Sequence, residues 1–137
     1  MNTKDKETIR NYIVDRVSSY SSEENIGFIQ FGYEPFQGGL LCVYFDTKKD
    51  AGPDGTWTIR LDGNSIDMNH WPELSENGGD EFSEQIGESI KQIVFELKEE
   101  GVFQALPKTE DCDFGIEEMN GSFGWPEYEK RKKINLV

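Results

Sequence analysis

The sequence predicts a single α+β domain over residues 1–137. Two segments with apolar residues at helical spacing, residues 4–20 and 81–100, lie on either side of strand-like runs within residues 26–61. Helices that precede and follow a set of antiparallel strands form the layer arrangement of α+β proteins. The length of the chain is that of one ordinary domain. A domain of this size buries roughly two-thirds of its unfolded surface, so it needs no metal or disulfide to fold.

The first helix is expected over residues 4–20, with Thr3 as its N-cap. Its apolar residues recur at intervals of three or four and form one stripe, which is the pattern of a helix that packs on a core. The stripe consists of Ile9, Tyr12, Ile13, Val17 and Tyr20.

Three runs rich in β-branched and aromatic residues predict strands at residues 26–34, 40–47 and 56–61. The second run is apolar on both faces, so we place it in the middle of the sheet. The loop at residues 35–39 is short and ends in glycine, which favours an antiparallel hairpin. A fourth, short edge strand is expected at residues 66–68. The predicted sheet is therefore an antiparallel meander of three or four strands.

The second helix is expected over residues 81–100, with Asp80 as its N-cap and Gly101 as its C-terminal stop. A glycine inside a helix costs up to about 1 kcal/mol relative to alanine. We therefore expect Gly87 to mark a close approach of this helix to the sheet.

Two neighbouring segments are expected to be irregular. Pro72 favours an extended or turn conformation at Trp71, and residues 73–79 are expected to form a loop with a glycine pair. Further along the chain, the acidic residues 110–113 are also expected to form a loop.

The charge is strongly acidic, with 27 acidic and 14 basic residues and a net charge of −13. Between Asp62 and Glu118, 16 carboxylates stand against three lysines. Such a field repels nucleic acid and anionic membranes and steers cationic partners toward the protein. No apolar run approaches the roughly 20 residues that a membrane span requires. The composition thus excludes nucleic-acid binding and membrane insertion and favours either a basic partner or a merely solvating acidic surface.

No catalytic, metal-binding or cofactor-binding motif emerges from the sequence. The sequence has one histidine, His70, and lacks the Gly-x-Ser-x-Gly motif whose serine a catalytic histidine would activate. Cys42 and Cys112 lack the basic surroundings that activate a thiol. Cysteine and histidine residues do not occur at zinc spacing. We expect no cofactor and no metal, and we read both cysteines as thiols of a cytoplasmic protein without an export signal.

The chain resembles the small, acidic, cytoplasmic immunity proteins of bacterial toxin systems. The resemblance lies in size, acidity, the order of a helix before the strands, and the lack of catalytic motifs. It implies a protein that binds one cognate toxin domain and occludes its active site, and it transfers no residue-level site.

Two function classes remain open at this stage. The first is an immunity or inhibitor protein that caps a basic partner, such as a toxin domain, with acidic residues and exposed aromatic residues. The second is a small carboxylate-based enzyme or ligand-binding domain of unknown substrate. Under the first hypothesis the partner-binding residues are His70, Trp71, Glu84, Glu88, Asp111, Asp113 and Trp125.

Overall fold

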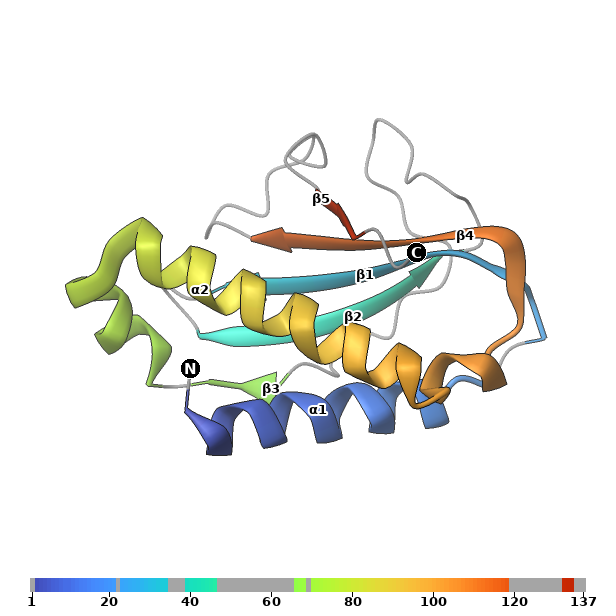
Figure 1. Cartoon of the computed structure of the whole chain (residues 1–137), viewed down its shortest axis with the longest axis horizontal. Coiled ribbons are helices and arrows are strands. Elements are labelled where there is room, and N and C mark those ends of the chain that lie inside the picture. The colour runs from blue at the N-terminus through green and yellow to red at the C-terminus, as the bar shows by residue number, and fades with distance from the viewer. Residues whose placement is uncertain are drawn as a thin grey trace.

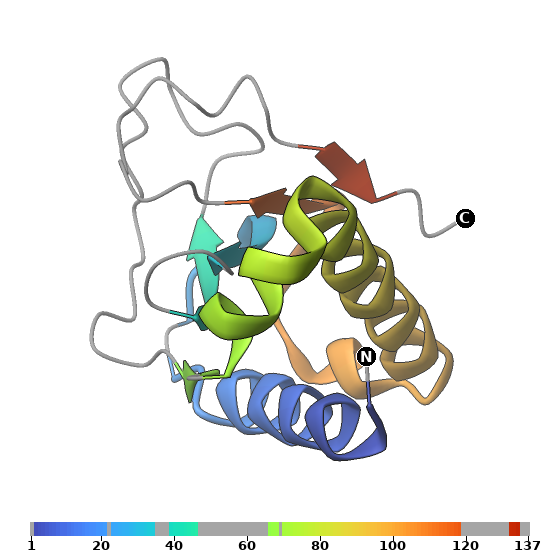
Figure 2. The same cartoon turned by 90° about the vertical axis from the view of Figure 1, so that its left-hand side faces the viewer.

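The structure is a computed structural model, and it describes residues 2–21, 23–34, 39–46, 66–68, 70–118 and 132–134. Its main helices and its strands form two layers, with both helices on one face of a mixed sheet (Figures 1 and 2). In chain order the elements are α1 (Thr3–Ser18), β1 (Ile26–Glu34), β2 (Leu40–Asp46), β3 (Ile66–Asp67), α2 (Trp71–Glu99), the 3₁₀ turn η1 (Val102–Ala105), β4 (Lys108–Glu118) and β5 (Lys132–Ile134).

The sheet has the strand order β3-β2-β1-β4-β5. The strands β1 and β2 form the expected antiparallel hairpin, in which Phe31 lies opposite Val43. The other neighbour of β1 is β4, which runs parallel to it and places Ile116 opposite Phe31. A parallel pair needs a long crossover, and α2 lies on that crossover. The α+β class is confirmed, whereas the expectation of a purely antiparallel meander is wrong.

The central strand is β1 and not the second run, as the sequence had led us to expect. All nine residues of β1 are buried, and the strand has a neighbour on each side in the sheet. The expected short edge strand is confirmed: β3 pairs with Leu40 and Leu41 of β2. The predicted strand at residues 56–61 lies outside the described residues.

The hydrophobic core lies between the sheet and the two helices (Figure 2). Alternation along β1 turns Ile29, Phe31 and Tyr33 toward the helices, where they join the apolar stripes of α1 and α2. None of the described helices combines the length and the apolar composition that a membrane span requires.

The starts of both helices differ from the sequence prediction. The N-cap of α1 is Asn2, one residue before Thr3, and its side-chain oxygen accepts a hydrogen bond from the backbone N–H of Asp5 at 2.7 Å. The second helix begins at Trp71, about ten residues early. Pro72 occupies its first turn, where a missing N–H carries no penalty.

The expected loop at residues 73–79 is wrong, because these residues continue α2. The helix is interrupted only at Gly79, whose φ of 54° and ψ of −138° are non-helical and disfavoured for residues with a side chain. At its other end Gly101, with φ of 79°, follows the helix as predicted.

The expected close approach at Gly87 is confirmed. A Cβ atom at this position would lie 2.7 Å from the hydroxyl oxygen of Tyr33 on β1. That hydroxyl donates a hydrogen bond to the backbone carbonyl of Ser83 at 3.2 Å, so the tyrosine bridges the sheet and the preceding turn of α2.

Residues 110–113 belong to β4 and do not form the expected loop. The register between β1 and β4 shifts between the pair Ile26–Lys108 and the pair Phe28–Asp113. This irregularity leaves Glu110 and Asp111 exposed, which explains why the segment reads as a loop in the sequence.

Candidate functional site

Trp71, one of the two tryptophans that we expected to contact a partner, is part of the core. The side chain of Trp71 is 0 % exposed and packs within the hydrophobic cluster. A fully buried indole cannot contact a partner without local unfolding, so the expectation of an exposed Trp71 is wrong. The physical reason is that the chain enters α2 at this residue and turns its side chain inward. Trp125 lies outside the described residues.

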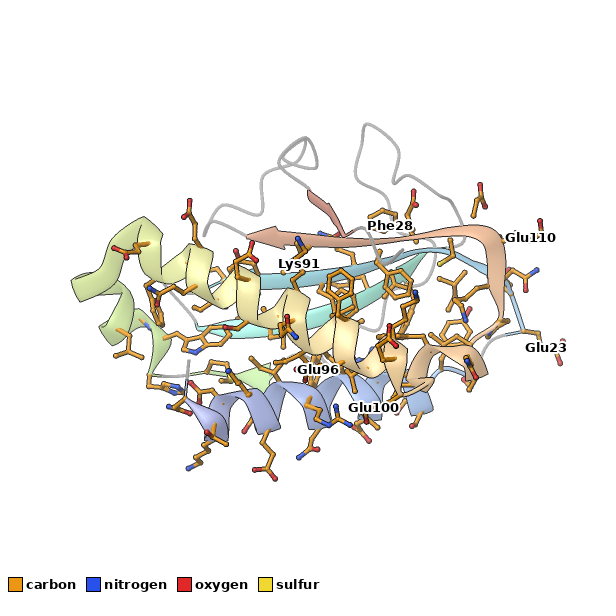
Figure 3. The ribbon with its side chains drawn as sticks, in the orientation of Figure 1. Glu23, Phe28, Lys91, Glu96, Glu100 and Glu110 are labelled. Carbon is orange, nitrogen blue, oxygen red and sulfur yellow. The ribbon has the colours of Figure 1, made fainter. Side chains whose placement is uncertain are left out.

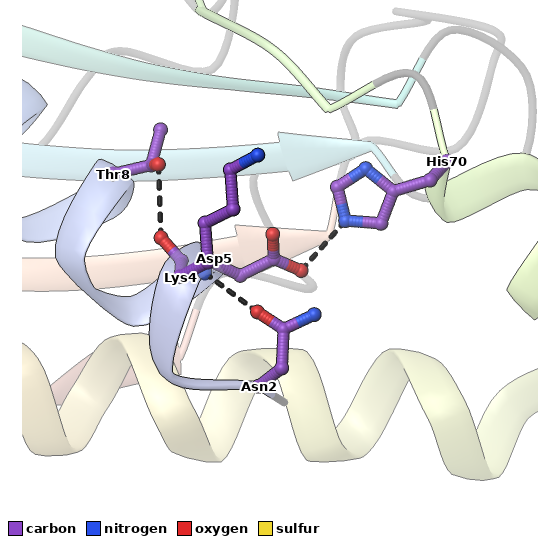
Figure 4. A network of polar contacts seen from close by, with 5 residues as sticks. All are labelled: Asn2, Lys4, Asp5, Thr8 and His70. Atoms are coloured by element: carbon purple, nitrogen blue, oxygen red, sulfur yellow. Dashed lines mark hydrogen bonds and ion pairs between the residues drawn. The ribbon is translucent and has the colours of Figure 1, made fainter.

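His70 is exposed and is held by a residue that the sequence analysis did not single out. Its Nε2 lies 2.6 Å from Oδ2 of Asp5, at the start of α1 (Figure 4). The Asp5 side chain is 9 % exposed and that of His70 is 45 % exposed. Asp5 also donates its backbone N–H to Asn2, and Thr8 bonds the carbonyl of Lys4 in the same first turns (Figure 4). The histidine therefore joins the starts of the two helices.

Glu84 and Glu88, two of the predicted partner-binding residues, are exposed on α2. Together with Glu81 they are spaced by three and four residues, which places them in one stripe along the helix. All three side chains are exposed, and residues 81–90 contain no lysine or arginine. We call Glu81, Glu84 and Glu88 the acidic stripe.

The structure does not bring Asp111 and Asp113 to this stripe. Asp113 lies opposite Phe28, and Phe28 alternates with the core-facing Ile29. Asp113 therefore points to the sheet face opposite the helices, whereas the acidic stripe lies on the helical layer. The residues that the sequence grouped by charge thus occupy two different surfaces.

A groove of about 560 Å³ lies between α1 and α2. Glu88 of the acidic stripe is one of its walls, and Ile93, which is 4 % exposed, contributes apolar surface. The remaining walls are mostly polar or charged. The lining residues are Thr3, Lys6, Glu7 and Arg10 from α1, and Glu88, Ser89, Gln92, Ile93 and Glu96 from α2.

Arg10, which lines the groove, forms an ion pair with Glu100 that joins the two helices. Both terminal nitrogens of Arg10 donate to the carboxylate of Glu100, one of them at 2.7 Å, in a two-pronged contact. This contact raises the pKa of Arg10 and lowers the pKa of Glu100. Glu96, which lies with Glu100 between the helices in Figure 3, adds to the negative field at Arg10. Arg10 is therefore already matched by carboxylates.

Two carboxylates of the groove remain available. Among the residues that the structure describes, the side chains of Glu7 and Glu88 take part in no hydrogen bond or ion pair. Glu7 belongs to α1 and Glu88 to α2, so they face the groove from different helices. The α1 wall is a part of the site that sequence reasoning missed, because nothing in a linear charge pattern indicates which helices will lie side by side.

The cysteines have the properties of packing residues. Cys42 and Cys112 form no disulfide. Burial raises the pKa of Cys112 to about 11, which disfavours the thiolate that a nucleophile needs. Within the described ranges, no three side chains of the histidine, cysteine, aspartate and glutamate types are grouped so as to hold a metal ion.

Comparisons of the chain with protein-family models, with curated proteins and with solved structures give no match. The function is therefore inferred from the described residues alone.

Proposed function

We propose that the protein is a non-enzymatic acidic binding protein, an immunity or inhibitor protein that caps a basic partner such as a toxin domain. The observation that carries the proposal is the acidic stripe of Glu81, Glu84 and Glu88 on the exposed side of α2. The proposed contact surface is this stripe together with the adjoining groove between α1 and α2.

The charge of the molecule favours a partner of positive charge. The net charge of −13 gives the whole molecule a field that attracts cations, and the stripe concentrates that field on one helix face. Charges at the rim of an interface act mainly on the rate of association and on the choice of partner. A rapid, salt-dependent encounter with a basic protein is the behaviour expected of such a surface.

The carboxylates do not favour the alternative of a small enzyme. That alternative would gain support from two buried carboxylates facing one another in a cleft. The most buried carboxylates in the described part of the chain are those of Asp5 and Glu34. Asp5 bonds His70 on the helical side, whereas Glu34 alternates with the core-facing Tyr33 and points to the other side of the sheet.

The proposal is tested by affinity capture from a lysate of the source cells with three baits. The first is the wild-type protein, and the second carries Glu84→Lys and Glu88→Lys. The third carries Glu23→Lys and Glu110→Lys, which changes the net charge by the same amount. Glu23 and Glu110 are exposed, and both lie at the end of the molecule away from the start of α2 (Figure 3).

A basic protein that the wild-type and control baits retain at low salt, and that the Glu84/Glu88 bait loses, is the expected result. Equal retention by all three baits would refute the acidic stripe as the binding surface. Loss from both charge-reversed baits would show that net charge alone attracts the captured protein.

A further inference from the structure

The groove between α1 and α2 has more negative charge than its own basic residues can match. With Arg10 held by Glu100, its lining retains one cation, Lys6, against Glu7, Glu88 and Glu96. Glu96 accepts a hydrogen bond from Gln92 at 3.3 Å and lies in the field of Arg10, so it is partly occupied. Glu7 and Glu88 therefore supply the negative charge that a ligand would meet.

The dimensions of the groove suit a short stretch of chain. Glu88 and Glu96 are eight residues apart on α2, which corresponds to about 12 Å along the helix axis. An extended segment rises roughly 3.3 Å per residue, so about four residues would span this length. Between these two carboxylates the lining also contains Ser89, Gln92 and the nearly buried Ile93.

We propose that this groove receives an arginine-bearing segment of the basic partner, with one guanidinium group held between Glu7 and Glu88. This inference rests on the proposed function and names the chemistry of the partner at one part of the surface. Arginine fits better than lysine because its planar guanidinium is weakly hydrated and can bond two carboxylates at once. Arginine anchors that fill pockets are also the side chains that dominate many protein interfaces.

The test uses the isotope-labelled full-length protein and a capped nine-residue peptide with a central arginine, titrated at low salt and followed by NMR. Counterparts with lysine or citrulline at the centre serve as ligand controls. Ser89→Trp fills the groove without changing its charge, and Gln85→Trp places the same side chain at an exposed position of α2 outside the groove lining. Thermal unfolding checks that each variant is folded, and Glu7→Gln with Glu88→Gln tests the carboxylates without added bulk.

The expected result is a set of amide shifts that follows the groove lining on both helices, with binding in the order arginine, lysine, citrulline. Ser89→Trp and the Glu7/Glu88 double variant should each bind the arginine peptide at least tenfold more weakly, and Gln85→Trp should bind like the wild type. Equal binding of the three peptides, or unchanged binding to Ser89→Trp, would overturn the inference.

The Ser89→Trp variant also separates the two proposals when it is used as a bait in the capture experiment. If it retains the basic partner while the Glu84/Glu88 variant loses it, the groove proposal fails and the proposed function stands. If neither change affects capture, the groove and the acidic stripe are both refuted as the binding surface, and the proposed function fails if the wild-type bait captures no basic protein.

Discussion

Asp5 and His70 connect the first turn of α1 to the N-cap of α2 through a contact of 2.6 Å between Oδ2 and Nε2. Their separation of 65 residues makes this contact a long-range restraint on the two helices. Because the groove lies between the same two helices, the pair helps to fix the geometry of the proposed binding surface.

Removal of His70 is expected to leave the buried carboxylate of Asp5 without its partner. We expect His70→Ala to lower the free energy of unfolding by about 1–2 kcal/mol, because a buried acceptor that loses its hydrogen bond retains the cost of desolvation. Urea denaturation of Asp5→Asn, His70→Ala and the double variant measures the coupling between the residues. Strictly additive losses would contradict a direct interaction, and Glu7→Gln, an exposed change on the same helix, provides the control.

The burial of Trp71 predicts an effect on stability. Trp71→Ala should cost about 3–5 kcal/mol of unfolding free energy, the usual range for removing a large core side chain. Trp71→Phe should cost less because it keeps much of the apolar volume. Chemical denaturation measures both values. If Trp71→Ala denatured at the same midpoint as the wild type but bound the partner more weakly, Trp71 would be a contact residue after all.

The effect of Gly87→Ala on the free energy of unfolding is expected to change sign when Tyr33 is replaced by phenylalanine. Gly87→Ala should lower the unfolding free energy, because the new Cβ would lie 2.7 Å from the Tyr33 hydroxyl and displace it from Ser83. In a Tyr33→Phe background the hydroxyl is absent and the nearest ring carbon lies 3.4 Å away. There the same change should gain up to about 1 kcal/mol from helix propensity. Equal effects of Gly87→Ala in both backgrounds, measured by urea denaturation, would contradict this account.

Tyr12 predicts a loss of stability at strongly alkaline pH. Burial raises the pKa of Tyr12 to about 12, from an ordinary value of 10.0. Since the folded-state pKa is the higher one, the stabilising contribution is fully present below pH 10 and is lost as the pH rises through about 12. The urea midpoint of the wild type should therefore fall more steeply over this window than that of Tyr12→Phe. If the urea midpoints of the wild type and Tyr12→Phe fell equally over this pH range, the raised pKa of Tyr12 would be refuted.

The helices could be predicted from the sequence because their apolar residues recur at helical spacing. The parallel strand β4 could not. Its segment KTEDCDFGIEE has acidic residues in the shifted part of its register, and only its later half, at Phe114 and Ile116, carries a clear core signal. The parallel β1–β4 pair is set by tertiary packing of the crossover, which no local pattern reports.

The candidate site was predicted in part. The exposed positions of Glu84 and Glu88 follow from the amphipathic pattern of α2, which turns Ile86 and Ile90 inward. The contribution of α1 was missed because the presence of Glu7 and Glu88 in one groove depends on how two helices far apart in the sequence pack. Trp71 was misassigned because Pro72 was taken as a sign of extended chain, although proline is equally suited to the first turn of a helix.

Binding of a basic partner by the acidic stripe on α2 is best examined through the kinetics of association. The partner captured by the wild-type protein would be mixed with the wild type, the Glu84/Glu88 reversal and the Glu23/Glu110 control over a series of salt concentrations. We predict that the Glu84/Glu88 reversal slows association by about tenfold or more at low salt and flattens its salt dependence, while the control changes the rate far less. Equal association rates for the wild type and the Glu84/Glu88 reversal at every salt concentration would contradict the claim.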